Sequence, residues 1–221
     1  MLTMILVFGI ALTVLIAKRD TVRKTTVIMY DFDPEMEHLY GNLHAAAEAL
    51  AQSSAMWHIE SIGRVRNQKY HAGAANLLSR KRTGITKAEP PYLKTNVDTV
   101  AIAVGRQVLH FFPDRLLVYT AEGVGAVSYQ NLDISVSGTR FIEEDRLPKD
   151  ARVVDHTWKY VNKSGGPDKR FNNNRQLPIC MYDELTLSSS SGLKEVVQIS
   201  NLGITQAFVD AVRLAGTSVV P

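Results

Sequence analysis

The sequence predicts an α+β protein in which a transmembrane helix is followed by a small α/β unit and then by an antiparallel sheet closed by a C-terminal helix. Three observations predict it: an uncharged N-terminal run, a strand–helix–strand pattern, and a series of short strands that ends in an amphipathic helix. We assign these parts to residues 1–17, 25–95 and 97–216. The 221 residues leave enough chain after the first run for one large or two small domains.

The first 17 residues, MLTMILVFGIALTVLIA, carry no charge. As a helix they would reach about 25 Å, the short end of what crosses a hydrocarbon core of about 30 Å. Lys18, Arg19, Arg23 and Lys24 follow this run. Because positive residues stay on the cytoplasmic side, the pattern predicts a single-pass protein of the cell membrane whose C-terminal domain lies in the cytoplasm.

Two other interpretations of the first 17 residues compete. A cleaved signal peptide normally has a basic region before its apolar run and small residues at its exit, whereas this run is preceded only by the α-amino group and ends in Leu-Ile-Ala-Lys-Arg. A buried helix would show a polar stripe, and only Thr3, Gly9 and Thr13 interrupt the run. A membrane span fits the pattern best.

Residues 25–32 (TTVIMYDF) predict a strand, because they are rich in β-branched and aromatic residues. Asp33 and Pro34 follow as a helix N-cap and a first-turn proline. The helix predicted after them has an apolar stripe at three- and four-residue steps: Met36, Leu39, Tyr40, Leu43, Ala47 and Leu50. A second strand is expected at 56–62, a short helix at 74–78 and a boundary at Pro90-Pro91.

From Val97 onward, tight turns separate short apolar strands, which predicts an antiparallel meander. Its strands are expected at 100–104, 107–112, 115–120 and 124–129, and further strands at 133–141, 157–161, 179–187 and 195–200. The last helix is expected over 203–215, with one apolar stripe formed by Ile204, Ala207, Phe208, Ala211, Val212 and Ala215.

A meander closed by one C-terminal helix resembles the pleckstrin-homology-like fold, in which such a helix plugs one end of a bent antiparallel sheet. The likeness covers about 97–216. Three segments, HFFPDRLLVY (110–119), DHTWKYVNKSGGPDKRFNNNRQLPI (155–179) and SSSSGLKEVVQIS (188–200), also resemble an uncharacterised bacterial protein family. That resemblance implies a bacterial origin and a shared domain, and it transfers no catalytic residue.

The formal net charge of +3 names no partner, but its distribution is uneven. Residues 61–88 contain no acid, and residues 158–178 contain five bases against the single acid Asp168, with a Gly-Gly-Pro break and three consecutive asparagines. Both segments predict sites for an anion or for a partner's backbone. The candidate binding residues are Arg64, Arg66, Lys69, Arg80, Lys81, Arg82, Lys163, Lys169, Arg170 and Arg175.

Catalytic and metal-binding patterns are weak. Asp31-Phe32-Asp33 after a strand resembles the opening motif of haloacid-dehalogenase-type phosphotransferases, but the other residues and the βαβ repeats of that mechanism are missing, and Asp33 is also explained as a helix cap. His38 and His44 are six residues apart and share no helix face. Cys180, the single cysteine, lies among apolar neighbours. We therefore assign no catalytic residue, metal or cofactor.

The sequence hypothesis is a membrane-anchored cytoplasmic binding or scaffold protein without catalytic activity. Its partners would be the membrane itself, anionic lipid or another protein. Two alternatives stay open: a phosphate-directed enzyme that uses Asp31 and Asp33, and a nucleic-acid binder that uses the basic segment 64–87. Nucleic acid ranks after lipid because Tyr70 is the only aromatic residue in that segment.

Overall fold

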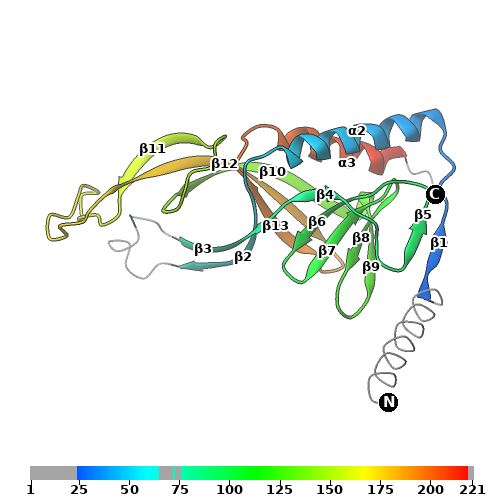
Figure 1. Ribbon diagram of the computed structural model, residues 1–221, viewed down its shortest axis with the longest axis horizontal. Helices are drawn as coiled ribbons and strands as arrows, with labels where there is room; N and C mark the ends of the chain where they lie inside the picture. Colours follow the sequence, from blue (N-terminus) through cyan, green and yellow to red (C-terminus); the bar gives the residue numbers. More distant parts are fainter. Residues whose placement is uncertain (1–23, 65–71, 73–75, 219–221) are drawn as a thin grey trace, which may run out of the picture.

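The computed structural model describes residues 24–64, 72 and 76–218. Strands make up 46% of the chain and helices 20%, so the protein is mostly β and the predicted α+β class is corrected. Figure 1 shows the elements in chain order: β1 (Thr26–Ile28), α2 (Pro34–Ala51), β2 (Met56–Arg64), β3 (Asn76–Thr83), β4 (Ile85–Lys87), β5 (Leu93–Thr95), β6 (Val100–Val104), β7 (Gln107–Phe111), β8 (Arg115–Tyr119), β9 (Val124–Ser128), the 3-10 turn η2 (Tyr129–Asn131), β10 (Leu132–Ile142), β11 (Arg152–Trp158), β12 (Gln176–Ser189), β13 (Lys194–Ile199) and α3 (Thr205–Ser218).

The larger sheet is antiparallel and has the order β10-β12-β13-β2-β3, with β11 paired to the first half of β12. The 14-residue strand β12 is its central strand, because β10 pairs with one side of it and β13 and β11 pair with the other. β2 joins this sheet through only three residues, 56–58, which pair with 197–199. The rest of the β2–β3 hairpin therefore runs beyond β13 (Figure 1).

The smaller sheet is the meander, with the order β4-β6-β7-β8-β9. The meander strands lie within one residue of their predicted bounds because tight turns join them. The β6–β7 turn needs glycine: Gly105 has a φ of 59°, and a Cβ there would lie 3.2 Å from Cε1 of His58. β1 and β5 form a separate two-stranded parallel sheet.

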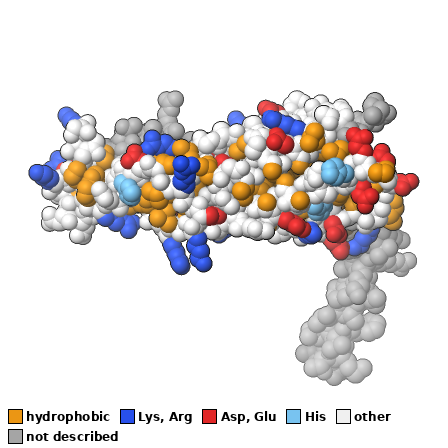
Figure 2. Space-filling model, turned by 90° about the horizontal axis from the view of Figure 1, so that it is seen from above, with side chains coloured by type: hydrophobic (Ala, Val, Ile, Leu, Met, Phe, Trp, Pro, Cys, Tyr) orange, Lys and Arg blue, Asp and Glu red, His pale blue; other side chains and the backbone are white. Residues whose placement is uncertain are grey.

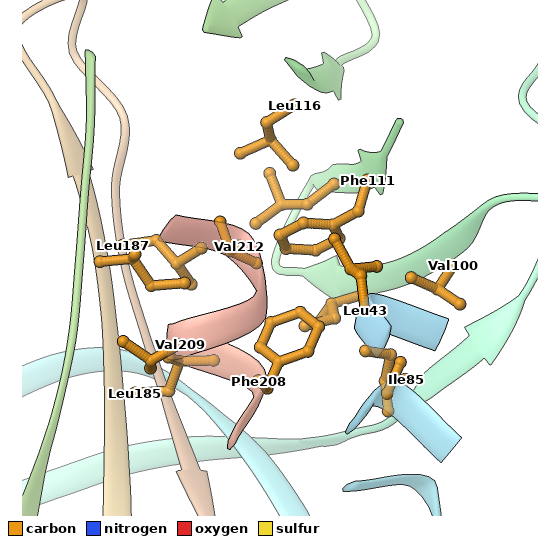
Figure 3. Packing of buried hydrophobic residues seen from close by; sticks show 14 of the residues in the cluster. Leu43, Ile85, Val100, Phe111, Leu116, Leu185, Leu187, Phe208, Val209 and Val212 are labelled. Carbon is orange, nitrogen blue, oxygen red and sulfur yellow. The ribbon is translucent and has the colours of Figure 1, made fainter. Parts of the chain in front are cut away.

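The two helices pack against each other along one side of the molecule, with α2 next to β4 of the smaller sheet and α3 next to β10 of the larger sheet (Figure 1). Together with both sheets they close one continuous apolar core (Figure 3). α3 contributes Phe208, whose ring meets that of Phe111 on β7 edge-on, with the ring centroids 5.1 Å apart. α2 is fixed to the same strand because the Tyr40 hydroxyl donates to the Phe111 carbonyl at 3.2 Å. The core residues labelled in Figure 3 come from both sheets and both helices: Leu43, Ile85, Val100, Phe111, Leu116, Leu185, Leu187, Phe208, Val209 and Val212.

Carboxylates cap both helices. Asp33 Oδ1 accepts the amide of Met36 at 2.7 Å, as the sequence predicts for the start of α2. The cap of α3 comes from the distant strand β12, where Asp183 Oδ2 accepts the amides of Gly203 at 2.9 Å and Thr205 at 3.3 Å. The start of α3 is therefore hydrogen-bonded to β12, the central strand of the larger sheet.

The pleckstrin-homology-like expectation is wrong. The described residues form no closed barrel, and the meander and strands β10–β13 lie in different sheets. Both sheets also cross the predicted boundary near residue 96, because β2 pairs with β13 and β4 pairs with β6. The helix expected at 74–78 is wrong as well, since 76–83 form strand β3, and the first predicted strand is limited to 26–28.

The transmembrane helix expected at 1–17 lies outside the described residues. Among the residues that the structure does describe, no helix is long and apolar enough to cross a membrane. α2, with 18 residues, carries Glu35, Glu37 and Glu48, and α3 has only 14 residues. On this finding the predicted single-pass architecture and the cell-membrane location are corrected.

Truncating Phe208 is expected to destabilise the protein strongly, because this side chain lies in the core. The side chain is fully buried, so Phe208→Ala is expected to lower the free energy of unfolding by about 3–5 kcal/mol. Urea denaturation followed by circular dichroism measures the change. Leu214→Ala on the same helix is the control, because Leu214 is 50% exposed and its loss is expected to cost little. Equal midpoints for the two variants would contradict the assignment of Phe208 to the core.

Candidate anion-binding site

The two basic segments of the sequence lie at the same end of the molecule. The described residues within 56–83 and 140–178, which we call the arm, form the end that carries β2, β3, β11 and the first half of β12 (Figure 1). Ala72 joins the two segments, because its amide donates to the Lys159 carbonyl at 3.1 Å and its carbonyl accepts from the Thr157 hydroxyl at 2.9 Å. Segments about 80 residues apart in sequence thus build one surface.

Charge is divided between the arm and the rest of the structure. The described residues of the arm include 13 Lys and Arg and 7 Asp and Glu, a net charge of +6. The remaining described residues, which we call the body, include 7 Lys and Arg and 14 Asp and Glu, a net charge of −7. Figure 2 shows Lys and Arg spread over the arm and most Asp and Glu over the opposite end. A total of +3 conceals this separation.

Arg80 is not an exposed binding residue, although the sequence places it in a basic run. Its guanidinium lies between the rings of Trp57 and Phe141, at 4.0 and 3.9 Å from their centroids. Its Nη2 donates to both carboxylate oxygens of Glu143, at 2.8 and 2.7 Å, and its Nη1 donates to Gln198 at 3.1 Å. Such a planar, charge-assisted and stacked arrangement suits arginine and joins β3 to β13 and to the residue that follows β10.

Glu143 is the buried partner of this pair, with 2% of its surface exposed. The Tyr182 hydroxyl donates to Glu143 Oε1 at 2.7 Å, so the carboxylate accepts from two side chains. Burial first, and then the hydrogen bond to Glu143, raise the pKa of Tyr182, which keeps this hydroxyl a donor. Burial likewise raises the pKa of the neighbouring Cys180 thiol, as expected for an unreactive cysteine.

Lys81 and Arg82, next to Arg80 on β3, are both exposed. The Arg82 guanidinium donates to the Ser54 carbonyl and lies 5.7 Å from the Trp57 ring centroid. No hydrogen bond or ion pair within the described residues engages the Lys81 side chain. Of the three consecutive bases, Lys81 is therefore the exposed one whose charge no other described residue engages.

The segment 159–175, which we call the distal loop, has a defined fold. Asn174 pairs with the backbone of Tyr160 in both directions, accepting its amide at 3.0 Å and donating to its carbonyl at 2.8 Å. The rings of Tyr160 and Phe171 stack with centroids 4.1 Å apart. Asn162 Oδ1 accepts the amides of Ser164 and Gly166 and so closes the tip. Asn174, one of the three consecutive asparagines predicted to bind a partner, thus holds the loop together.

The cations of the distal loop differ in their surroundings. The Asp168 carboxylate, which is 5% exposed, accepts from the Arg170 guanidinium at 3.0 and 2.8 Å. Arg175 donates to the Glu144 carbonyl at 3.0 Å. Lys163 and Lys169 are exposed, and no hydrogen bond or ion pair within the described part of the chain holds their side chains. These two lysines therefore present their charge to solvent.

Three predicted binding residues remain. Arg64 is the last residue of β2, whereas Arg66 and Lys69 lie outside the described residues. Arg152, an exposed base on β11, was not among the predicted binding residues because it lies outside both basic segments. Arg152 belongs to the arm because β11 pairs with β12, and local composition does not show this pairing.

The carboxylates proposed for an enzyme are not brought to the basic loop. Asp33 caps α2, and Asp31 is exposed at the end of the body opposite the arm. A cavity of about 330 Å³ lies beside β5, lined in part by Glu89, Lys94 and Asp98, and neither Asp31 nor Asp33 lines it. Among the described residues, no three His, Cys, Asp or Glu side chains converge as metal ligands.

No protein-family model, curated protein or solved structure matches this chain. The resemblance to an uncharacterised bacterial family therefore stays a prediction.

The contacts of Arg80 predict that this side chain makes a large contribution to the stability of the protein. Arg80→Met would leave the Glu143 carboxylate buried without its cation, and breaking such a pair costs about 3–5 kcal/mol of unfolding free energy. Urea denaturation measures this loss. The double variant Arg80→Met, Glu143→Leu is expected to recover most of it, because no unpaired charge remains.

Arg82→Met is the matched control for this experiment. It removes an exposed arginine two residues away, beside the same tryptophan, and is expected to change stability by less than about 1 kcal/mol. Equal stability for Arg80→Met and Arg82→Met would show that Glu143 does not depend on Arg80.

Proposed function

We propose that this protein is a nucleic-acid-binding protein whose arm contacts the phosphate backbone. The observation that carries the proposal is the union of two basic segments, distant in sequence, on one end of a molecule whose other end is acidic. Phosphate contacts supply most of the sequence-independent affinity for nucleic acid, and they need accessible Lys and Arg. Lys81, Lys163 and Lys169 meet this requirement.

The spread of the cations favours an extended polyanion over a single phosphate. A site for one phosphate gathers several donors on a shared pocket or helix N-terminus. Here the accessible charges lie on separate elements: Lys81 on β3, Arg152 on β11, and Lys163 and Lys169 in the distal loop. A strand of nucleic acid can contact charges on several separate elements in succession.

The defined fold of the arm also supports this proposal. A charged side chain on an ordered backbone loses less conformational freedom on binding than one on a disordered tail. The Asn174 and Tyr160 backbone pairing fixes the distal loop, and Arg80 fixes the β3 side. We infer that structural residues of the basic segments hold the arm while exposed lysines contact phosphate.

The proposal predicts a loss of binding when three accessible lysines are removed together. The triple variant Lys81→Ala, Lys163→Ala, Lys169→Ala is expected to bind a fluorescent DNA duplex about 100-fold more weakly, since each base near a phosphate surface contributes about 1 kcal/mol. Fluorescence anisotropy at several salt concentrations measures it. The slope of log K against log salt is expected to fall by about 2.7, or about 0.9 for each contact.

A charge-matched variant of the body is the control. Lys87→Ala, Arg106→Ala, Lys194→Ala removes three exposed bases outside the arm, and its affinity is expected to stay close to that of the native chain. Equal losses in both triple variants would show that net charge alone drives binding. Equal binding of polyglutamate, or binding of anionic vesicles without binding of DNA, would also overturn the proposal.

A further inference from the structure

β9 is the uncharged edge of the smaller sheet. Its sequence is VGAVS, and among the described strands it pairs only with β8. The other edge strands of the two sheets carry charges. β3 has Lys81 and Arg82, β10 has Asp133 and Arg140, and the three-residue β4 ends in Lys87. Charges on an edge oppose pairing with another chain, and β9 has no such protection.

The outer edge of β9 presents unpaired backbone groups. The Thr120 amide donates to the Gly123 carbonyl at 2.8 Å, which makes this a hydrogen-bonded pair at the start of the β8–β9 ladder. Pairs alternate along an antiparallel ladder, so the N–H and C=O groups of Val124 and Ala126 face away from β8. Both residues are exposed, and Val124 keeps 55% of its surface accessible.

We propose that β9 pairs antiparallel with β9 of a second copy of this chain, with a two-fold axis at Ala126. In this register Ala126 faces Ala126 and Val124 faces Ser128 of the other copy, so outward donors of one strand meet outward acceptors of the other. No charged residue faces another charge of the same sign along the paired strands. The two five-stranded sheets become one continuous sheet, and the assembly closes as a dimer.

The dimer joins the molecules through their bodies. Each body carries a net charge of −7, so repulsion opposes association at low salt and is screened as salt rises. Dimerisation is therefore expected to strengthen with salt, whereas nucleic-acid binding by the arm weakens. This opposite salt dependence makes the two proposals separable. The dimer would also hold two arms in one assembly.

The test compares two Ala-to-Lys variants of the full chain. Ala126→Lys places two like charges opposite each other across the two-fold axis, while the control Ala207→Lys adds the same charge on the exposed face of α3. Analytical ultracentrifugation from about 1 μM to about 1 mM measures the mass, a range that covers weak dimers. The native chain and Ala207→Lys are expected to reach the mass of two chains, and Ala126→Lys to stay at one.

Hydrogen exchange locates the interface. The amides of Val124 and Ala126 are expected to exchange at least about tenfold more slowly at high than at low protein concentration in the native chain, and equally fast at both in Ala126→Lys. A native chain that remains one chain in mass throughout overturns the proposal. So does a dimer that persists in Ala126→Lys, because the association would then use another surface.

Discussion

The position of the arm depends on the pair formed by Arg80 and Glu143. β2 joins the larger sheet through residues 56–58 alone, and Arg80 is paired in register with Ile59, the first residue of β2 beyond that junction. There the arginine reaches across to a buried carboxylate that follows β10. A carboxylate in this position has a high desolvation cost unless a cation and hydrogen bonds compensate it. The pair therefore favours one orientation of the β2–β3 hairpin over a range of loosely attached ones.

The hairpin has a second attachment near its far end. There Ala72 exchanges backbone and side-chain hydrogen bonds with Lys159 and Thr157, which lead into the distal loop. Two attachments hold the β2–β3 hairpin in one orientation, whereas a single attachment would let it rotate. The body has a comparable arrangement, because α3 is held to the larger sheet by its Asp183 cap and to the smaller sheet by Phe208. In both cases contacts that are distant in sequence determine how locally regular elements are arranged.

Local signals predicted local structure well. The meander, α2 and α3 follow from turn chemistry, periodicity and caps, which act within a few residues. The assignment of strands to sheets failed because it depends on pairing across long separations, such as His58 with Val197. The helix expected at 74–78 failed for the same reason, since pairing with β2 makes this stretch a strand.

The candidate site was predicted in the same incomplete way. Composition identified two basic segments, and the structure brings them together. Composition could not identify which bases are exposed. Arg80 and Lys81 are adjacent in sequence, yet Arg80 lies between two aromatic rings and pairs with a buried carboxylate, whereas Lys81 is exposed to solvent. Strand alternation predicts opposite faces for neighbours, but which face is covered depends on Glu143, 63 residues away.

The division of charge makes the arm a stronger electrostatic feature than the whole chain. β12 runs from the arm into the body, and its 14 residues at about 3.3 Å each extend about 46 Å. The Debye length at physiological salt is about 8 Å, so the acidic body screens little of the field at the far end of the arm. A polyanion is attracted at one end and repelled at the other, and this orients its approach toward the arm. A net charge near zero is therefore compatible with a strongly basic binding surface, because the two opposite fields act at separate ends of the molecule.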